Sequence, residues 1–159
     1  MTKLIPLTQG KFAIVDDEDY TQLNNVKWYT FKSRGSWYAA RNISGRPTFM
    51  HRLILNLKKG EYTDHINGDG LDNRRANLRV ATRSQNAMNS RKGISSSSIF
   101  KGVSYHKKNK KWVALIGSHY LGSFSTQPEA ARAYDAAAKK LFGEYASLNF
   151  PIKEVENVE

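Results

Sequence analysis

The chain has 159 residues, with 25 lysines and arginines against 14 acids, a formal net charge of +11 and no cysteine. Without cysteine it can hold neither a disulfide-stabilised fold nor a cysteine-ligated zinc ion. The sequence shows no signal peptide, and no apolar run approaches the ~18 residues of a membrane span. We therefore expect a cytoplasmic protein without a membrane partner, built as one domain or two small ones.

The positive charge is concentrated in the middle of the chain. No acid occurs between Asp72 and Glu129, and residues 73–128 hold eleven of the bases. The other fourteen bases are matched in number by the acids. A run of charge is commonly only a solvated surface, but an acid-free stretch of this length favours a face that binds a polyanion. Nucleic acid is the expected partner.

The first fifty residues are typical of a small, β-rich module. Short runs of β-prone residues between polar turns predict strands at 11–15, 28–31, 37–43 and 47–50. Residues 16–26 begin with acids and continue with spaced apolar residues, which predicts a short helix. The aromatic residues of the strands are expected in the core, with the alternative that an exposed one stacks on a base: Trp28, Tyr29, Phe31, Trp37 and Tyr38.

A second short helix is predicted over residues 51–57 (HRLILNL). Lys58, Lys59 and Gly60 follow, which are residue types that favour a helix C-terminus. We expect His51, at the start of this helix, to have a structural or phosphate-contacting role rather than a catalytic one.

The stretch DHINGDGLDNRRANLRVATRSQN, residues 64–86, has the order strand, polar loop, strand, helix. Residues 82–85 (TRSQ) form a capping box, which marks the start of a helix. Four polar side chains that could take part in catalysis or metal binding are distributed over the stretch: Asp64, His65, Asn77 and Asn86.

This stretch resembles the ββα-metal motif of the HNH nucleases, and the resemblance extends upstream to His51. It implies that Asp64 and Asn86 bind a divalent metal, that His65 is the general base and that Asn77 orients His65. Carboxylate and amide oxygens suit Mg²⁺ or Mn²⁺. The resemblance further implies cleavage to a 5′ phosphate and a 3′ hydroxyl.

Two observations qualify this interpretation. Neighbouring residues of a regular strand point to opposite faces, so Asp64 and His65 can share a site only if the strand kinks or ends there, or if DNA lies across its edge. The alternative for the loop is a polar turn held by local side-chain hydrogen bonds. We expect Asp69, Asp72 and Asn73 to have only that role.

After a Gly/Ser-rich linker at residues 91–99, a second unit is predicted over residues 100–150, followed by an acidic tail at 151–159. Strands are expected at 100–106, 111–117 and 119–124. A capping box at Thr126 and Glu129 begins a helix over 127–142. One stripe of that helix is expected to face the sheet: Ala130, Tyr134, Ala137 and Leu141.

The segments FKGV, KWVALI, LGSF and EAARAYDAAA make this second unit similar to the AP2 DNA-binding domain. That resemblance implies a three-stranded antiparallel sheet laid in the major groove, with one helix across its back. Lys101, Ser104, His106 and Trp112 occupy the matching contact positions. AP2 transcription factors favour arginines where Ser104 and His106 stand, so we expect lysine–phosphate contacts and modest base specificity.

We predict an α+β protein in which residues 1–90 hold the β-rich module and the HNH unit, the core motif being 51–90. The predicted function is a metal-dependent endonuclease of the HNH homing type, monomeric and acting on double-stranded DNA, similar to proteins of phages and mobile introns. The alternatives are a DNA-binding regulator that keeps the ββα unit as a scaffold, and an RNA-binding protein. The expected nucleic-acid contacts are Arg74, Arg75, Arg79, Arg83, Lys92, Lys101, Ser104, His106, Lys107, Lys108, Lys110, Lys111 and Trp112.

Overall fold

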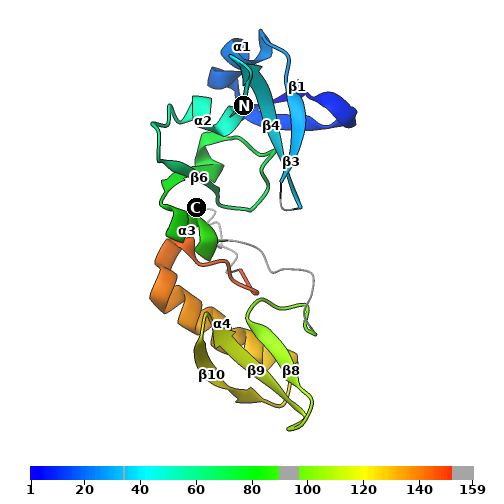
Figure 1. Cartoon of the computed structure of the whole chain (residues 1–159), viewed down its shortest axis with the longest axis vertical. Coiled ribbons are helices and arrows are strands. Elements are labelled where there is room, and N and C mark those ends of the chain that lie inside the picture. Colours follow the sequence, from blue (N-terminus) through cyan, green and yellow to red (C-terminus); the bar gives the residue numbers. More distant parts are fainter. Residues whose placement is uncertain (34, 90–96, 152–159) are drawn as a thin grey trace, which may run out of the picture. The chain divides into compact units, whose positions relative to one another are not determined.

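The computed structural model describes residues 1–33, 35–89 and 97–151 (Figure 1). The chain divides into two compact units, Met1–Ala87 and Met88–Glu159. Lys92, most of the predicted linker and the predicted tail after Pro151 lie outside the described residues. Small antiparallel sheets accompanied by helices confirm the mixed α+β class. Within the described parts of the chain, no helix is both long and apolar enough to cross a membrane.

The first unit starts with two small antiparallel sheets. A hairpin pairs β1 with β2, and a second sheet has the order β3-β4-β5. Two short helices follow β2 and β5. Their bounds are β1 Thr2–Pro6, β2 Phe12–Asp16, α1 Asp17–Asn24, β3 Tyr29–Ser33, β4 Ser36–Ile43, β5 Arg46–Phe49 and α2 Met50–Ile54.

The rest of the first unit is the predicted strand–loop–strand–helix segment. Strand β6 (Tyr62–His65) pairs antiparallel with β7 (Leu78–Ala81), and α3 (Arg83–Met88) follows. The capping box is confirmed: the Gln85 side chain accepts from the Thr82 backbone N–H at 2.8 Å, and the Thr82 hydroxyl accepts from the Gln85 N–H at 3.2 Å. Strand β6 ends at His65, which is one of the arrangements that would let Asp64 and His65 share a site.

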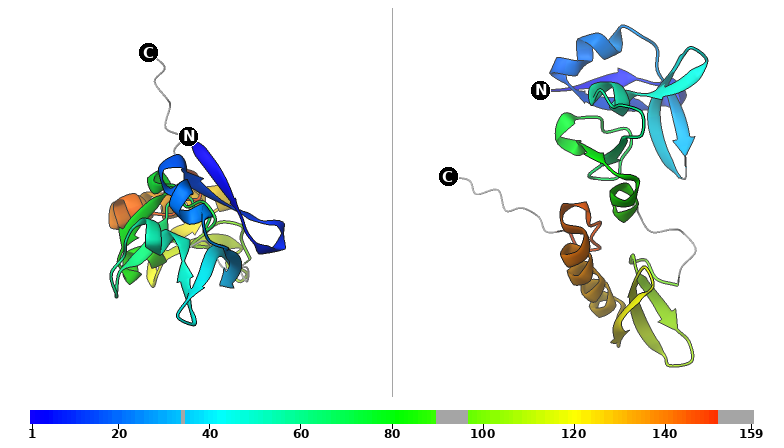
Figure 2. Two further views of the ribbon diagram at one scale, coloured as in Figure 1. Left: turned by 90° about the horizontal axis from the view of Figure 1, so that it is seen from above. Right: turned by 60° about the vertical axis from the view of Figure 1, so that its left-hand side comes forward.

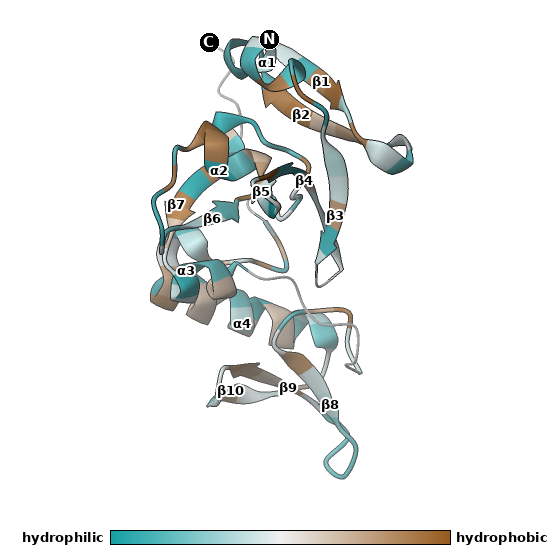
Figure 3. Cartoon of the chain, turned by 45° about the horizontal axis from the view of Figure 1, so that its top comes forward, coloured by the Kyte–Doolittle hydropathy of each residue, from teal (hydrophilic) through white to brown (hydrophobic). Residues whose placement is uncertain are grey.

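One core joins the β-rich module to this segment. Ile5, Val15, Trp28 and Met50 from the module pack in the same buried cluster as Leu78 of β7. The apolar stretches of β1, β2 and α2 appear brown in Figure 3. Strand β1 was not predicted, because only Ile5 of its five residues is buried and the apolar pattern is correspondingly weak. The β-rich module and the ββα segment therefore fold as one body.

The predicted core aromatics divide into two groups. Trp28 is buried, and its indole N–H donates to the Leu23 carbonyl oxygen at 2.8 Å. The other four, Tyr29, Phe31, Trp37 and Tyr38, are only half-buried, which corrects the expectation that all five fill the core. Two of the half-buried rings lie beside charged or titratable side chains. Lysine ammonium groups lie over the Trp37 ring, and Tyr38 lies beside two histidines.

The second unit is a three-stranded antiparallel sheet with one long helix across one face (Figure 2). The sheet has the order β10-β9-β8, and its helix is α4. Their bounds are β8 Val103–His106, β9 Lys111–Ile116, β10 His119–Phe124 and α4 Gln127–Phe142. Both hydrogen bonds of the predicted capping box at Thr126 and Glu129 are present.

Alanines let α4 approach the sheet closely. Ala130, Ala131 and Ala138 are fully buried, together with Tyr134. The prediction that Leu141 belongs to the buried stripe is wrong. Leu141 is 59% exposed, because Phe142 packs against the cluster around Tyr134 in the last turn of the helix.

We predict that replacing Gly102 by alanine destabilises the second unit by about 2–4 kcal/mol, the sum of left-handed strain and overpacking. Gly102 has φ +71°, and an added Cβ would overlap the Tyr134 ring. Gly117→Ala is the matched control, because Gly117 has φ +59° but open space around it, and it should cost only about 1 kcal/mol. Urea unfolding followed through NMR signals of β9 measures both. Equal losses would contradict the contact.

Candidate functional site

Asp64 is a buried acid paired with an arginine. It is 2% exposed and stands opposite Arg79 in the β6–β7 register. Arg79 donates to the same Asp64 oxygen, Oδ2, from Nε at 2.8 Å and from Nη2 at 2.6 Å. The Arg79 side chain is itself only 14% exposed, so this pair is screened from solvent far more than a surface ion pair. Arg79, predicted as a DNA contact, thus lies at the first candidate metal ligand.

His65 is buried among aromatic rings at the end of β6. It is 7% exposed, and its ring centroid lies 5.0 Å from that of His51 and 5.9 Å from that of Tyr38. Burial lowers the pKa of His65 from its ordinary value, against the opposing effects of the Asn73 side chain and nearby carboxylates. A lowered pKa keeps the imidazole neutral near pH 7, the form that can accept a proton.

Asn77 fixes the backbone directly after His65. Its carbonyl oxygen accepts from the Ile66 N–H at 2.9 Å, and its side-chain oxygen accepts from the Asn67 N–H at 2.9 Å. The side-chain amide donates to the Asp72 carbonyl oxygen at 2.8 Å. The contacts to Ile66 and Asn67 secure the start of the polar loop, so Asn77 holds His65 through the main chain that follows it.

The loop acids behave as predicted, in local hydrogen bonds. The Asp69 carboxylate accepts from the Leu71 N–H at 3.0 Å, and the Asp72 carboxylate accepts from the Asn67 side chain at 2.9 Å. Arg74 adds an ion pair to Asp72 at 2.6 Å, and hydrogen bonding from Arg74 holds the pKa of Asp72 below its usual range. The predicted DNA contact Arg74 therefore closes the loop.

Asn73 contributes more than the expected turn. It is fully buried, its N–H donates to the Ile14 carbonyl oxygen at 2.7 Å and its side-chain amide donates to the Leu71 carbonyl oxygen at 3.0 Å. The side chain also raises the pKa of His65, opposing the effect of burial. Sequence reasoning missed this link because it depends on Ile14, a residue of a distant strand.

Arg75 is held by the acids of helix α1. Its side chain pairs with Asp19 at 2.7 Å and Glu18 at 2.8 Å, while its backbone N–H donates to Asp16 at 2.8 Å. The Arg75 side chain remains 47% exposed, but its pair with Asp19 is bidentate and the Asp19 side chain is only 12% exposed, so this is more than an isolated surface pair. Arg75, predicted as a DNA contact, thus links the polar loop to helix α1.

Helix α3 carries the remaining predicted residues of the first unit. Asn86 lies one turn after the cap, where its N–H donates to the Thr82 carbonyl oxygen at 3.0 Å, and its side chain is half-buried. Arg83 is exposed in the first turn. The described residues contain no group of three or more His, Cys, Asp or Glu side chains placed to hold a metal. A carboxylate oxygen from Asp64 and an amide oxygen from Asn86 are donor types that suit a hard divalent cation.

The second unit presents a basic sheet face directed away from α4. Val103 and Ala114 are a cross-strand pair buried against the helix, so their strand neighbours Ser104 and His106 point to the opposite face. Exposed lysines extend this face along the β8–β9 hairpin, at Lys107, Lys108, Lys110 and Lys111. Tyr120 is 63% exposed opposite Leu115 on the same face and was not predicted as a contact. The available signal was an aromatic residue on the strand that pairs with the predicted contact strand β9.

Two predicted contacts lie elsewhere in the second unit. Trp112 packs against the core cluster of Val103 and Ala130, with the Tyr105 ring 4.9 Å away, which matches the expectation that it equally serves the core. The Lys101 ammonium lies 6.0 Å from the centre of the Tyr134 ring, and burial lowers the pKa of Lys101. These two residues are therefore turned from the basic face towards α4.

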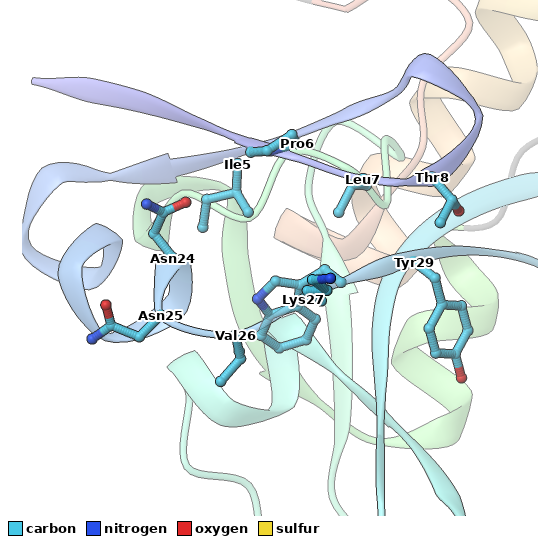
Figure 4. A pocket seen from close by; sticks show the side chains of 10 residues that line it. Ile5, Pro6, Leu7, Thr8, Asn24, Asn25, Val26, Lys27 and Tyr29 are labelled. Atoms are coloured by element: carbon cyan, nitrogen blue, oxygen red, sulfur yellow. The ribbon is translucent and has the colours of Figure 1, made fainter.

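A separate hollow in the first unit has no catalytic groups. It has a volume of about 640 Å³ and lies between the end of β1 and residues 24–29 (Figure 4). Aliphatic side chains, amides, Trp28, Tyr29 and Lys27 line it, and no acid or histidine is among these residues. The chemistry of this unit is therefore sought around Asp64 and His65.

Fold and site together define a two-unit DNA-acting protein: a ββα unit with an acid–histidine pair, followed by a three-stranded sheet with a basic face. Comparison with known families agrees. Residues 48–88 match the HNH endonuclease family and residues 98–144 match the AP2 domain.

Known proteins resemble both the whole chain and its second unit. A protein of Acanthamoeba polyphaga mimivirus, described as an uncharacterized HNH endonuclease, is 32% identical over 149 residues, covering 89% of this chain and 76% of that protein. The AP2-like ethylene-responsive transcription factor ANT of Arabidopsis thaliana is 48% identical over 61 residues, covering 35% of this chain and 11% of the factor. No solved structure matches. The chain belongs to the HNH endonuclease family and carries an AP2 domain.

We predict that the lowered pKa of His51 makes the first unit less stable in mild acid. Burial, His65 and Arg52 lower the pKa of His51 to about 3 in the folded chain. The unfolded chain protonates at ~6.5, so the stabilisation is complete above that pH and is lost as the pH falls towards 3. His51→Phe should reduce the stability difference between about pH 7.5 and pH 5 by roughly 1–2 kcal/mol, measured by urea unfolding.

The control for this prediction is His119→Gln, at an exposed position on β10. It should leave the pH dependence of the first unit as in the wild type. A His51→Phe protein with the wild-type loss of stability would show that His51 is already protonated in the folded state.

Proposed function

We propose that the chain is a metal-dependent DNA endonuclease of the homing type, whose AP2 domain places the HNH unit on double-stranded DNA. The observation that carries the proposal is the buried His65, whose pKa burial lowers, directly beside the buried Asp64 at the end of β6. Membership of the HNH endonuclease family supports the reaction class, and the mimivirus relative shares most of its length with this chain.

In the proposed reaction His65 acts as the general base. Its neutral imidazole accepts a proton from a water molecule, and the water oxygen attacks the phosphorus. The bond from phosphorus to the 3′ oxygen breaks, and that oxygen takes up a proton, which leaves a 3′ hydroxyl and a 5′ phosphate. Positioned general bases of this kind contribute about 10²–10⁴-fold to a rate. Asn77 keeps His65 in place by fixing Ile66 and Asn67.

The proposed metal ligands are Asp64 and Asn86. Bound there, Mg²⁺ or Mn²⁺ would supply Lewis-acid stabilisation for the phosphate and the departing oxygen. Asp64 offers a buried carboxylate whose charge Arg79 already partly balances, and Asn86 offers an amide oxygen from α3. Arg83 would contact phosphates near the cut, and Arg74 and Arg75 would offer the guanidinium N–H groups that their carboxylate partners leave free.

The AP2 domain is proposed to supply most of the affinity. The exposed lysines of the β8–β9 hairpin neutralise phosphates, while Ser104, His106 and Tyr120 face the bases with few of the forked donors that read guanine. Affinity without strong base specificity suits a domain that holds the nuclease on DNA. A DNA-binding regulator without catalysis is the second candidate, and the first test below separates the two.

We predict that the wild type cuts supercoiled plasmid with Mg²⁺ but not with a chelator, and that His65→Ala lowers the cleavage rate by at least about 10²-fold. Binding to the same DNA, measured by gel shift, should stay within about twofold because His65 is buried. His119→Ala, which removes an exposed histidine of the other unit, is the control. A wild type that binds DNA but never cuts it would favour the regulator, and a small loss in His65→Ala would reject the base.

We predict that alanines at Lys108, Lys110 and Lys111 flatten the dependence of log K on log salt by about 2.7, at ~0.9 per phosphate contact. The ratio of affinities for two unrelated duplexes should change little. The double variant Lys139→Ala, Lys140→Ala is the control, because these exposed lysines lie on α4. A triple variant with the wild-type salt dependence would mean that the hairpin lysines are only solvated.

A further inference from the structure

His51 lies against the proposed general base without a role in the reaction. The rings of His51 and His65 meet edge to face, with centroids 5.0 Å apart and planes at 86°. Phe49 stacks on His51, with centroids 5.4 Å apart and planes at 4°. Tyr38 contacts both imidazoles, with centroids 5.9 Å from each. The β-rich module thus surrounds the His65 ring with flat side chains.

The His51 ring is positioned by packing against a neighbouring ring, without a hydrogen bond to Nδ1 from the described part of the chain. Nδ1 is buried and has no hydrogen-bond partner among the described residues. The ring plane of His51 is instead set by the parallel Phe49 ring, which ends β5 directly before helix α2 begins. The His51 ring, held by Phe49, restricts the orientation of the neighbouring His65 ring.

The neutral charge of the His51 ring is compatible with the proposed role of His65 as a base. Burial keeps the pKa of His51 near 3, so the ring is neutral where His65 has to accept a proton. A cation 5 Å away would oppose that proton transfer, whereas a neutral ring does not. His51 therefore limits the rotation of the His65 ring without weakening His65 as a proton acceptor.

We propose that His51, backed by Phe49, is a positioning residue that fixes the ring plane of His65 for proton abstraction. The inference rests on the proposed function of His65 and deepens it. A base works only within hydrogen-bond reach of the proton that it removes, and a misplacement of about 1 Å can cost 10²-fold in rate. Asn77 secures the backbone after His65, and His51 secures the side chain.

The matched variants are His51→Phe and His51→Leu in the full-length protein. Both are apolar and fill the space, but only phenylalanine offers a flat ring to Phe49 and His65. We expect His51→Leu to cleave at least about tenfold more slowly than His51→Phe in single-turnover reactions, with Kd for DNA within about twofold in both. His51→Met is a second non-planar variant and should behave like His51→Leu.

A second measurement does not depend on cleavage. In the metal-free protein, ring carbon–proton NMR signals should show one sharp set for His65 in the wild type and in His51→Phe, and broadened or multiple sets in His51→Leu. Equal rates for the leucine and phenylalanine variants, or a sharp single signal in all three proteins, would overturn the proposal. A wild type that cuts nothing but shows the expected signals would reject the proposed function while leaving the positioning of His65 intact.

Discussion

The candidate site depends on a short stretch of main-chain pairing between distant parts of the chain. Ile14 of β2 donates to the Leu71 carbonyl oxygen at 2.9 Å and accepts from the Asn73 N–H at 2.7 Å. This bridge fixes the far end of the polar loop, and Asn77 fixes its near end. With both ends held, Asn73 and Asp72 are buried against the site although they belong to a loop. The β-rich module is therefore part of the scaffold of the nuclease unit.

The sequence predicted the elements whose signals are local. The capping boxes at Thr82 and Thr126 depend on residues three apart, and both helices begin as those residues indicate. The adjacency of Asp64 and His65 likewise belongs to one stretch of chain, and the glycine-rich turn after it correctly indicated the end of β6. Patterns of this kind require no knowledge of what lies across the fold.

The contacts of the site residues could not be predicted from the sequence, because the partners come from other elements of the fold. Nothing in the order of residues shows that Arg79 faces Asp64, since that follows from the β6–β7 register. Arg75 meets Asp19, and His65 meets Tyr38 and His51, only after the β-rich module has folded onto the ββα segment. A charge count treats every arginine as free, whereas the structure divides them into those held by carboxylates and those exposed, such as Arg83.

The pairing of Asp64 with Arg79 lets the first unit fold without a cation at this carboxylate. A zinc finger needs its metal to fold, because the ligands have no other partner in the interior. Here a guanidinium already meets the buried carboxylate, so a cation-free chain carries no uncompensated negative charge at this position. Under the proposed function, withdrawing divalent ions would stop cleavage without unfolding the protein. Cleavage would then resume, with no refolding step, when ions and DNA return.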